Sequence, residues 1–287
     1  MELKIEGLSR AYGKHKVLHD INFSMHEGIY GLIGKNGAGK STLMRILATI
    51  DFPSNGKVFF NGKDIFSIGE EYRGMIGYMP QDYNIYSGFN AIDFLEYMGA
   101  LKGMKKQELK LKISDVLEIV NLSDVSHKKI RTYSGGMKRR IGIAQAILNN
   151  PDILILDEPT AGLDPSERLN FSNFISNLSR KKIVLLSTHI VSDIEAVAKE
   201  LIVMNKGKIL ESGKIEDLIM SNQGKVWEVV LTQEEYQQIQ KERKVIHVKQ
   251  NGNNMTVRYI GERFQTEENR EQEPTLEDYY ESLWLSQ

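Results

Sequence analysis

The sequence contains no cysteine, which excludes disulfide bonds and metal sites that depend on thiolate ligands. It also lacks long apolar runs. The longest, such as 153–156 and 183–186, are far shorter than the roughly 20 residues that a membrane-spanning helix requires. The N-terminus has neither the basic start nor the apolar stretch of a signal peptide. We therefore expect a soluble or peripheral protein, and any action on a membrane would need spanning helices from another chain.

A strong excess of one charge is also missing. The 37 Lys and Arg residues and 38 Asp and Glu residues leave a formal net charge of −1. This balance does not support nucleic-acid binding through bulk electrostatics, so no nucleic-acid partner is expected. Hydrophobic residues make up 41% of the 287 residues, which suffices for a buried core. The length favours one large domain with a small appendage at most.

Short apolar runs that suit buried strands alternate with amphipathic segments that suit helices. Strands are expected at 3–8, 17–25, 29–33, 58–60, 75–79, 153–156, 183–187 and 201–204, and helices at 41–49, 90–120, 134–148, 165–179 and 191–199. The alternation predicts an α/β protein built on a parallel sheet. Because the helices at 90–120 and 134–148 fall between two of its strands, a helical insert is expected at about 83–150.

The pattern of apolar and polar residues changes after about residue 221. Strands are expected at 226–231, 245–249 and 255–260, helices at 234–240 and 276–284, and a polar linker at 262–273. We therefore predict a main domain over residues 1–222 and a small α/β extension over residues 223–287.

The segment 34–42 carries the clearest chemical signal. It reads Gly34-Lys35-Asn36-Gly37-Ala38-Gly39-Lys40-Ser41-Thr42 and matches G-x-x-x-x-G-K-[ST]. Its glycines let the backbone wrap a phosphate chain with N–H groups pointing inward, and the following helix adds its positive N-terminal end. Lys40 can reach the β- and γ-phosphates, and Ser41 can offer its hydroxyl to Mg²⁺. The loop predicts binding and hydrolysis of Mg·ATP, with a purely structural glycine turn as the alternative.

Two carboxylates, Asp157 and Glu158, end the apolar run 153–156. Ligands bind at the carboxyl edge of a parallel sheet, so Asp157 is expected to hold the Mg²⁺ shell and Glu158 to polarise the attacking water. A solvated strand end is the alternative. His189 follows another strand at the same edge, within reach of a γ-phosphate, and Gln81 follows a third. Each of these last two residues is a weak signal alone.

Two further signals are also weak when taken singly. Tyr12 is an exposed aromatic candidate for stacking on adenine. Ser134 suits the cap of the helix at 134–148, but Gly135 and Gly136 weaken that helix start and need another reason. Close approach of the backbone to a phosphate is one such reason. A flexible turn is the other.

In their order and spacing, these residues resemble the ATP-binding cassette of ABC transporters over about residues 3–218. The resemblance assigns Tyr12 to adenine stacking, Gly34–Thr42 to the Walker A loop, Gln81 to the Q-loop, Ser134, Gly135 and Gly136 to the signature, 153–157 to Walker B, Glu158 to the catalytic glutamate, Asp164 to the D-loop and His189 to the switch histidine. It implies an α/β P-loop NTPase fold with an N-terminal antiparallel β subdomain, a helical subdomain at about 83–150 and a small C-terminal α/β extension.

The resemblance also implies a mechanism and partners. Two cassettes, as a homodimer or a heterodimer, would pair head to tail, so that each ATP lies between the phosphate loop of one chain and the signature of the other. Catalysis would use Glu158, His189 and Lys40, and Mg²⁺ would be held by Ser41, Gln81 and Asp157. The implied partner is a transmembrane permease subunit, contacted near residues 84–94. The implied location is cytoplasmic, on the inner face of the cell membrane.

One departure from the family pattern concerns the signature, which is most often Leu-Ser-Gly-Gly-Gln. Here Tyr133 and Met137 flank the intact Ser-Gly-Gly core. This variant, the following Lys138-Arg139-Arg140 and the ending at 273–278 resemble the ABC-2 type subgroup that exports drugs and antibiotics. The resemblance therefore favours export over uptake.

Two other functions compete with export. A soluble cassette protein of translation or DNA repair is the first, although such proteins carry two cassettes or long coiled coils. This chain has a single phosphate loop and no sustained heptads. An ordinary P-loop kinase or GTPase is the second, and the signature helix and His189 argue against it. Copurification with an integral membrane chain separates export from both.

Overall fold

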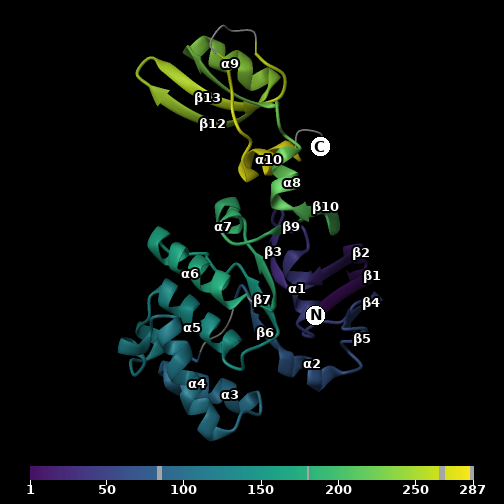
Figure 1. Cartoon of the computed structure of the whole chain (residues 1–287), viewed down its shortest axis with the longest axis vertical. Coiled ribbons are helices and arrows are strands. Elements are labelled where there is room, and N and C mark those ends of the chain that lie inside the picture. Colours follow the sequence, from purple (N-terminus) through teal and green to yellow (C-terminus); the bar gives the residue numbers. More distant parts are fainter. Residues whose placement is uncertain (83–85, 180, 265–268, 285–287) are drawn as a thin grey trace. The chain divides into compact units, whose positions relative to one another are not determined.

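The computed structural model describes residues 1–82, 86–179, 181–264 and 269–284 (Figure 1). The chain divides into two compact units, residues 1–212 and 213–287. The domain boundary expected at 222 stays a prediction. Among the described residues, no helix is both long and apolar enough to cross a bilayer.

The first unit is organised around a six-stranded sheet in the order β10-β9-β3-β8-β7-β6. Its strands are β3 (Gly28–Ile33), β6 (Ile76–Met79), β7 (Ile153–Asp157), β8 (Ile183–Ser187), β9 (Glu200–Asn205) and β10 (Lys208–Lys214). The pairs β6–β7, β7–β8, β8–β3 and β3–β9 are parallel. Every residue of β7 and β8 is buried, as expected for strands covered on both faces. The predicted parallel α/β sheet is confirmed.

A second, four-stranded sheet in the order β2-β1-β4-β5 forms the antiparallel part of this unit. It comprises β1 (Glu2–Tyr12), β2 (His15–His26), β4 (Asn55–Phe60) and β5 (Lys63–Asp64). Leu3 and Ile5 of β1 share one hydrophobic core with Met44 and Leu47 of helix α1. This core joins the predicted antiparallel subdomain to the parallel sheet through α1.

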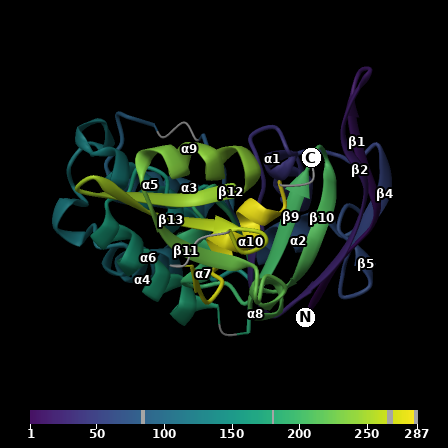
Figure 2. The same ribbon diagram turned by 90° about the horizontal axis from the view of Figure 1, so that it is seen from above.

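The helices of the first unit are α1 (Lys40–Leu47), α2 (Gly69–Met75), α3 (Ala91–Leu101), α4 (Lys106–Ile119), α5 (Gly135–Ile147), α6 (Pro165–Leu178) and α7 (Val191–Glu195), with 3₁₀ turns η1 (Ser123–Val125) and η2 (Ile130–Thr132). Helices α3 to α6 lie on one side of the unit and strands β1, β2 and β4 on the other (Figures 1 and 2). The predicted helical insert is therefore present, although its residues 83–85 lie outside the described part of the chain.

Two helix boundaries and one additional helix differ from expectation. The helical pattern at 90–120 is interrupted at Gly103, whose φ is +72°, so α3 and α4 are separate helices. The helix expected over 191–199 ends at Glu195, and by Lys199 the chain has joined the sheet, where Lys199 N–H donates to the Ile29 carbonyl at 3.2 Å. Helix α2 was not predicted, since two glycines mask its pattern. Its buried Tyr72 anchors it by donating to the Leu47 carbonyl at 2.9 Å.

The second unit holds an antiparallel sheet in the order β12-β13-β11-β14. Its elements are α8 (Ile215–Met220), β11 (Val226–Leu231), α9 (Gln233–Glu242), β12 (Lys244–Asn251), β13 (Asn254–Ile260), β14 (Arg270–Glu271) and α10 (Leu276–Ser282). Its own core includes Val229, Ile239, Val257 and Tyr259, and Figure 2 shows α9 lying along β12 and β13. The linker expectation at 262–273 was wrong at β14, because edge pairing with β11 uses backbone groups and needs no apolar side chain.

The segment 273–278 has a structural role in this unit. Asp278 is fully buried, and both of its carboxylate oxygens accept hydrogen bonds from Arg258, at 2.9 Å from Nε and 2.6 Å from Nη2. Thr275 caps α10 by accepting from Asp278 N–H at 3.3 Å, and Asp278 accepts from Thr275 N–H in return at 2.7 Å. Burial alone would raise the pKa of Asp278, but the hydrogen bonds from Arg258 and Thr275 hold that pKa below its ordinary value.

Asp278→Asn is therefore expected to destabilise the second unit. Removing one partner of a fully buried ion pair costs roughly 3–5 kcal/mol, and we expect about 2 kcal/mol because Arg258 keeps some solvent access. Both tryptophans, Trp227 and Trp284, belong to this unit, so urea unfolding followed by tryptophan fluorescence measures it selectively.

The exposed neighbour Glu277 offers a matched control, and Glu277→Gln should unfold like the parent chain. The charged form of Asp278 is the stabilising one, so its contribution is present above its unfolded pKa of about 3.8 and is lost as pH falls through the lower folded pKa. The difference between Asp278→Asn and the parent should shrink accordingly in acid. A difference that persists unchanged at pH 2 would contradict this explanation.

Candidate nucleotide-binding site

The phosphate loop connects the end of β3 to the start of α1, as predicted. Its glycines meet conformational and steric demands, and Gly34 and Gly39 show both kinds. A Cβ at Gly34 would lie 2.3 Å from the Met204 carbonyl oxygen. Gly39 precedes α1 with φ at +103°, a left-handed conformation that β-carbon-bearing residues rarely adopt. The loop can therefore approach both its neighbouring strand and a ligand more closely than a loop of larger residues.

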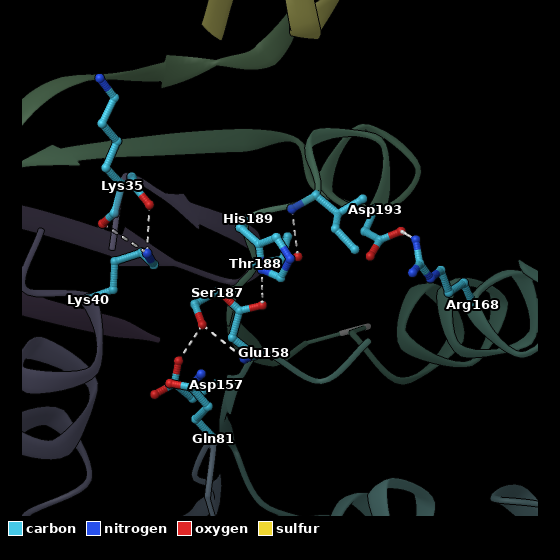
Figure 3. Close-up of polar contacts among 12 residues, drawn as sticks. Lys35, Lys40, Gln81, Asp157, Glu158, Arg168, Ser187, Thr188, His189 and Asp193 are labelled. Carbon is cyan, nitrogen blue, oxygen red and sulfur yellow. Dashed lines mark hydrogen bonds and ion pairs between the residues drawn. The ribbon is translucent and has the colours of Figure 1, made fainter. Parts of the chain in front are cut away.

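Lys40 is the first residue of α1, and it is 8% exposed. Its Nζ donates to the Gly34 carbonyl at 2.7 Å and lies 3.5 Å from the Lys35 carbonyl oxygen, so the side chain folds back over its own loop (Figure 3). Burial lowers the pKa of Lys40, while the nearby charges of Glu158 and Asp157 act to raise it. The loop thus holds an amine whose present partners are neutral carbonyls.

A cavity of about 320 Å³ lies beside the loop, large enough for a small-molecule site. Its lining residues are Val17, Asn36, Gly37, Ala38, Gly39, Lys40, Ser41, Thr42, Gln81, Asp157 and Glu158. The fold therefore brings together the loop, Gln81 just beyond the end of β6, and the two carboxylates after the apolar run of β7. Val17 was missed from sequence, because an aliphatic residue in a strand carries no chemical signal.

Asp157 and Glu158 are both buried, and Ser187 links them. Ser187 Oγ donates to Asp157 Oδ1 at 2.5 Å and accepts from Glu158 N–H at 3.0 Å (Figure 3). Because β7 and β8 are parallel neighbours with Asp157 opposite Ser187, the hydroxyl orients both acids. Ser187 was not identified from sequence, although its place at the end of a buried strand was the available signal.

The Glu158 carboxylate contacts His189, with 2.8 Å between Oε2 and Nδ1. The His189 side chain is 61% exposed, whereas that of Glu158 is 8% exposed. Figure 3 shows His189 and Glu158 pointing toward one another above Asp157. The two residues predicted for water activation and γ-phosphate contact therefore lie within hydrogen-bond distance.

Tyr12 is not among the residues that line the cavity. Its hydroxyl donates to Asp51, and the Arg10 guanidinium carbon lies 4.5 Å from its ring centroid. Arg10 also pairs with Asp51 at 2.6 Å. One ring face is thus covered by a cation, and stacking of adenine on Tyr12 stays a prediction.

The signature residues also lie apart from the cavity. Ser134 caps α5, accepting from Met137 N–H at 3.2 Å, and Ser134 and Gly135 are exposed. Gly136 is buried, and a Cβ there would lie 2.6 Å from Glu167 Oε2. Packing against Glu167 is therefore a structural reason for Gly136, which leaves Ser134 and Gly135 as the accessible part of the signature.

Asp164 of the predicted D-loop caps α6. It accepts hydrogen bonds from Glu167 N–H at 2.8 Å and Ser166 Oγ at 2.8 Å. The bond from the Glu167 backbone is the main reason why the pKa of Asp164 lies below its ordinary value. The cap fixes Asp164 at the start of α6, the helix whose Glu167 packs on Gly136 of α5.

The predicted metal ligands suit Mg²⁺ only together with a nucleotide. Among the described residues, no group of three or more His, Cys, Asp or Glu side chains could hold a metal on its own. The cavity offers a hydroxyl from Ser41, an amide from Gln81 and a carboxylate from Asp157. Mg²⁺ in nucleotide sites takes one or two carboxylates and completes its shell with phosphate and water oxygens, so this oxygen-donor set fits it.

A phosphate loop that faces two carboxylates at the carboxyl edge of a parallel sheet is the arrangement of a P-loop nucleoside triphosphatase. The sequence family described as ABC transporter matches residues 18–161. An uncharacterized ABC transporter ATP-binding protein of Bacillus subtilis, YxlF, is 37% identical over 78% of this chain and 75% of its own. Nod factor export ATP-binding protein I of Cupriavidus metallidurans is 34% identical over 77% of this chain and 74% of its own.

A solved structure described as the ATP binding subunit of an ABC transporter superposes with a TM-score of 0.70 and 27% identity, covering 77% of this chain and 93% of that one. The chain belongs to the ABC transporter family of ATP-binding proteins. It is accordingly an ATPase whose hydrolysis of ATP drives transport. The predicted fold and activity are confirmed.

Proposed function

We propose that this chain forms an ATP-bound dimer of cassettes that drives a separate permease subunit in export. The proposal rests on the lining of the cavity, which lacks the signature residues. The cavity holds the phosphate loop, Gln81 and both carboxylates, while Ser134 to Gly136 do not line it. The accessible Ser134 hydroxyl and Gly135 backbone, at the positive N-terminal end of α5, suit a phosphate supplied by another chain. A homodimer or a heterodimer of cassettes would complete the site.

Each residue of the site has a proposed role. Lys40 and the amides of the loop Gly34–Thr42 bind the phosphates. Ser41, Gln81 and Asp157 would hold Mg²⁺, which would supply positive charge to balance that of the transferred phosphoryl group. Glu158 orients the attacking water, and His189 moves from Glu158 to the γ-phosphate. Little covalent chemistry is required, because phosphoryl transfer is accelerated mainly by position and charge.

Export is the proposed direction of transport. The relative named for Nod factor export supports it, as do Tyr133 and Met137 in the signature and the ending at 273–278. Since no described helix crosses a bilayer, a separate permease would supply the membrane path and choose the substrate. The chain would then bind peripherally to the cytoplasmic face of the cell membrane. A soluble role in translation or DNA repair is the alternative.

An exposed aromatic cluster is the proposed contact with the permease. Tyr86 and Phe89 stack at 5.3 Å between ring centroids, and Tyr97 of α3 packs edge-on to both. Tyr86 is 54% exposed and Tyr97 is 38% exposed. Aromatic side chains are enriched at the centres of protein interfaces. The contact expected near 84–94 includes residues 84 and 85, which lie outside the described chain.

Copurification tests this proposal. The tagged chain, expressed in its own host and extracted with mild detergent, should recover an integral membrane protein. Tyr86→Ala combined with Tyr97→Ala should reduce that recovery at least about 10-fold, as expected for an aromatic anchor worth 2 kcal/mol or more. Leu111→Ala on α4, where the side chain is 71% exposed, is the control and should not reduce it. Recovery of ribosomes or DNA in place of a membrane protein would overturn the export function.

A further inference from the structure

We propose that Arg139, on the helix that carries the signature residues, is a positioning residue that aligns Glu158 and Gln81 for ATP hydrolysis. The inference rests on the proposed role of Glu158. Arg139 lies on α5, shortly after Ser134 caps it. The signature residues at the start of α5, Ser134 to Gly136, do not line the nucleotide cavity of their own chain. Arg139, on the same helix, contacts two residues that do.

The guanidinium of Arg139 contacts two backbone carbonyls. Its Nη1 donates to the Gln81 oxygen at 2.8 Å, and its Nη2 donates to the Glu158 oxygen. Gln81 and Glu158 both line the cavity but come from different strand ends. A rigid planar group that donates from two of its nitrogens holds its two acceptors at a set separation. Arg139 thereby fixes the backbone of Gln81 relative to that of Glu158.

Glu158 depends on such support because of its own conformation. Its φ is +52°, in the left-handed region that is unfavourable for a residue with a side chain. Its N–H donates to Ser187 Oγ and to the Ser187 carbonyl oxygen at 3.0 and 3.1 Å, and its carbonyl accepts from Arg139. Ser187 therefore holds the backbone on the N–H side of Glu158, and on the carbonyl side Arg139 adds to a local hydrogen bond from Ala161 N–H at 3.3 Å. Loss of Arg139 would leave the Glu158 carbonyl with the bond from Ala161 alone and remove the connection to Gln81, so the turn that aims the carboxylate into the cavity would be less well fixed.

The adjacent arginine has a different role. Arg140 pairs with Glu167 of α6 at 3.2 Å and donates to the Asn121 carbonyl at 3.1 Å. It thus connects α5 to its helical neighbours, while Arg139 reaches the site. Because Arg139 and the exposed signature residues share one helix, a displacement of α5 also displaces the support of Glu158. Alignment of the carboxylate consequently depends on where α5 lies.

The test compares Arg139→Ala and Arg139→Lys with Arg73→Ala, a control on α2 whose side chain is exposed. Arg139→Ala should lower kcat about 10- to 100-fold through misplacement of Glu158, with the KM for ATP within about twofold. Arg139→Lys should recover little, since an ammonium lacks the planar fork. Millimolar guanidinium should partly restore the Ala variant, and it should not affect Glu158→Gln or Arg73→Ala. Equal melting temperatures without nucleotide verify folding.

A double variant separates positioning from other roles. In the Glu158→Gln background, Arg139→Ala should lower the residual rate less than about twofold, because coupled residues are non-additive. An equal loss in both backgrounds, or a raised KM with unchanged kcat, would overturn the role of Arg139. If Arg139→Ala turns over normally while Glu158→Gln is inactive, the role of Arg139 is overturned and the proposed role of Glu158 stands. Normal turnover in Glu158→Gln would instead overturn the proposed role of Glu158.

Discussion

Glu158→Gln should lower ATP turnover by about 10²- to 10⁴-fold, the range of general-base catalysis, while ATP still binds. The substitution preserves the shape of an 8%-exposed side chain but removes the negative charge that orients water. The ligands of the phosphates and metal are unchanged, so the nucleotide should remain bound and the cassettes should stay paired. Phosphate release measures the turnover, and size-exclusion chromatography with ATP measures the trapped dimer.

The matched control for this experiment is Glu195→Gln. Glu195 ends α7 and is exposed, so its neutralisation should leave turnover within about twofold of the parent rate, as is usual for surface changes. Near-normal hydrolysis in Glu158→Gln would remove Glu158 from the general-base role. The contact between Glu158 and His189 would then be structural.

Lys40→Ala is expected to weaken ATP binding about 100-fold and to abolish measurable hydrolysis at physiological ATP. A hydrogen bond to a charged group is worth roughly 1.5–3 kcal/mol, and the upper part of that range applies to a buried site. Calorimetric titration with ATP measures the affinity directly. Because Lys40 pairs only with the Gly34 and Lys35 carbonyls in the described structure, stability without nucleotide should change little.

Two comparisons sharpen this prediction. ADP lacks the γ-phosphate, so its affinity should fall less than that of ATP in Lys40→Ala. Lys110→Ala, which removes an exposed lysine from α4, should bind ATP like the parent chain. Unchanged ATP affinity in Lys40→Ala would mean that the amine stays on its loop carbonyls and does not contact phosphate.

The phosphate loop was predictable because its chemistry is local. Gly34, Gly39, Lys40 and Ser41 act through backbone conformation and reach within one short segment, so their spacing alone carries the signal. The buried strands around it were predictable for a similar reason, since continuous apolar runs such as 153–156 leave few alternatives. Helix α2 and strand β14 lacked such patterns. Tyr72 and the pairing with β11 stabilise them, and both contacts are remote in sequence.

Two features of the site could be found only in three dimensions. Ser187 joins Asp157 to Glu158 because β7 and β8 are neighbours in register. Arg139 reaches Gln81 and Glu158 because α5 packs beside the ends of β6 and β7. Neither a serine at a strand end nor an arginine in a helix has a distinctive spacing. Their importance comes from which carbonyls and carboxylates the fold brings near them.

The sequence by itself determined the class of chemistry: a loop shaped for phosphate, an acidic pair at a strand end and the ordered motifs of an ABC cassette. These depend on short-range geometry, which residue types and spacing encode directly. The tertiary structure alone decided how the site is aligned, with Glu158 held in a left-handed turn between Ser187 and Arg139. Such support depends on the packing of segments distant in sequence, and no local pattern specifies which of them will meet.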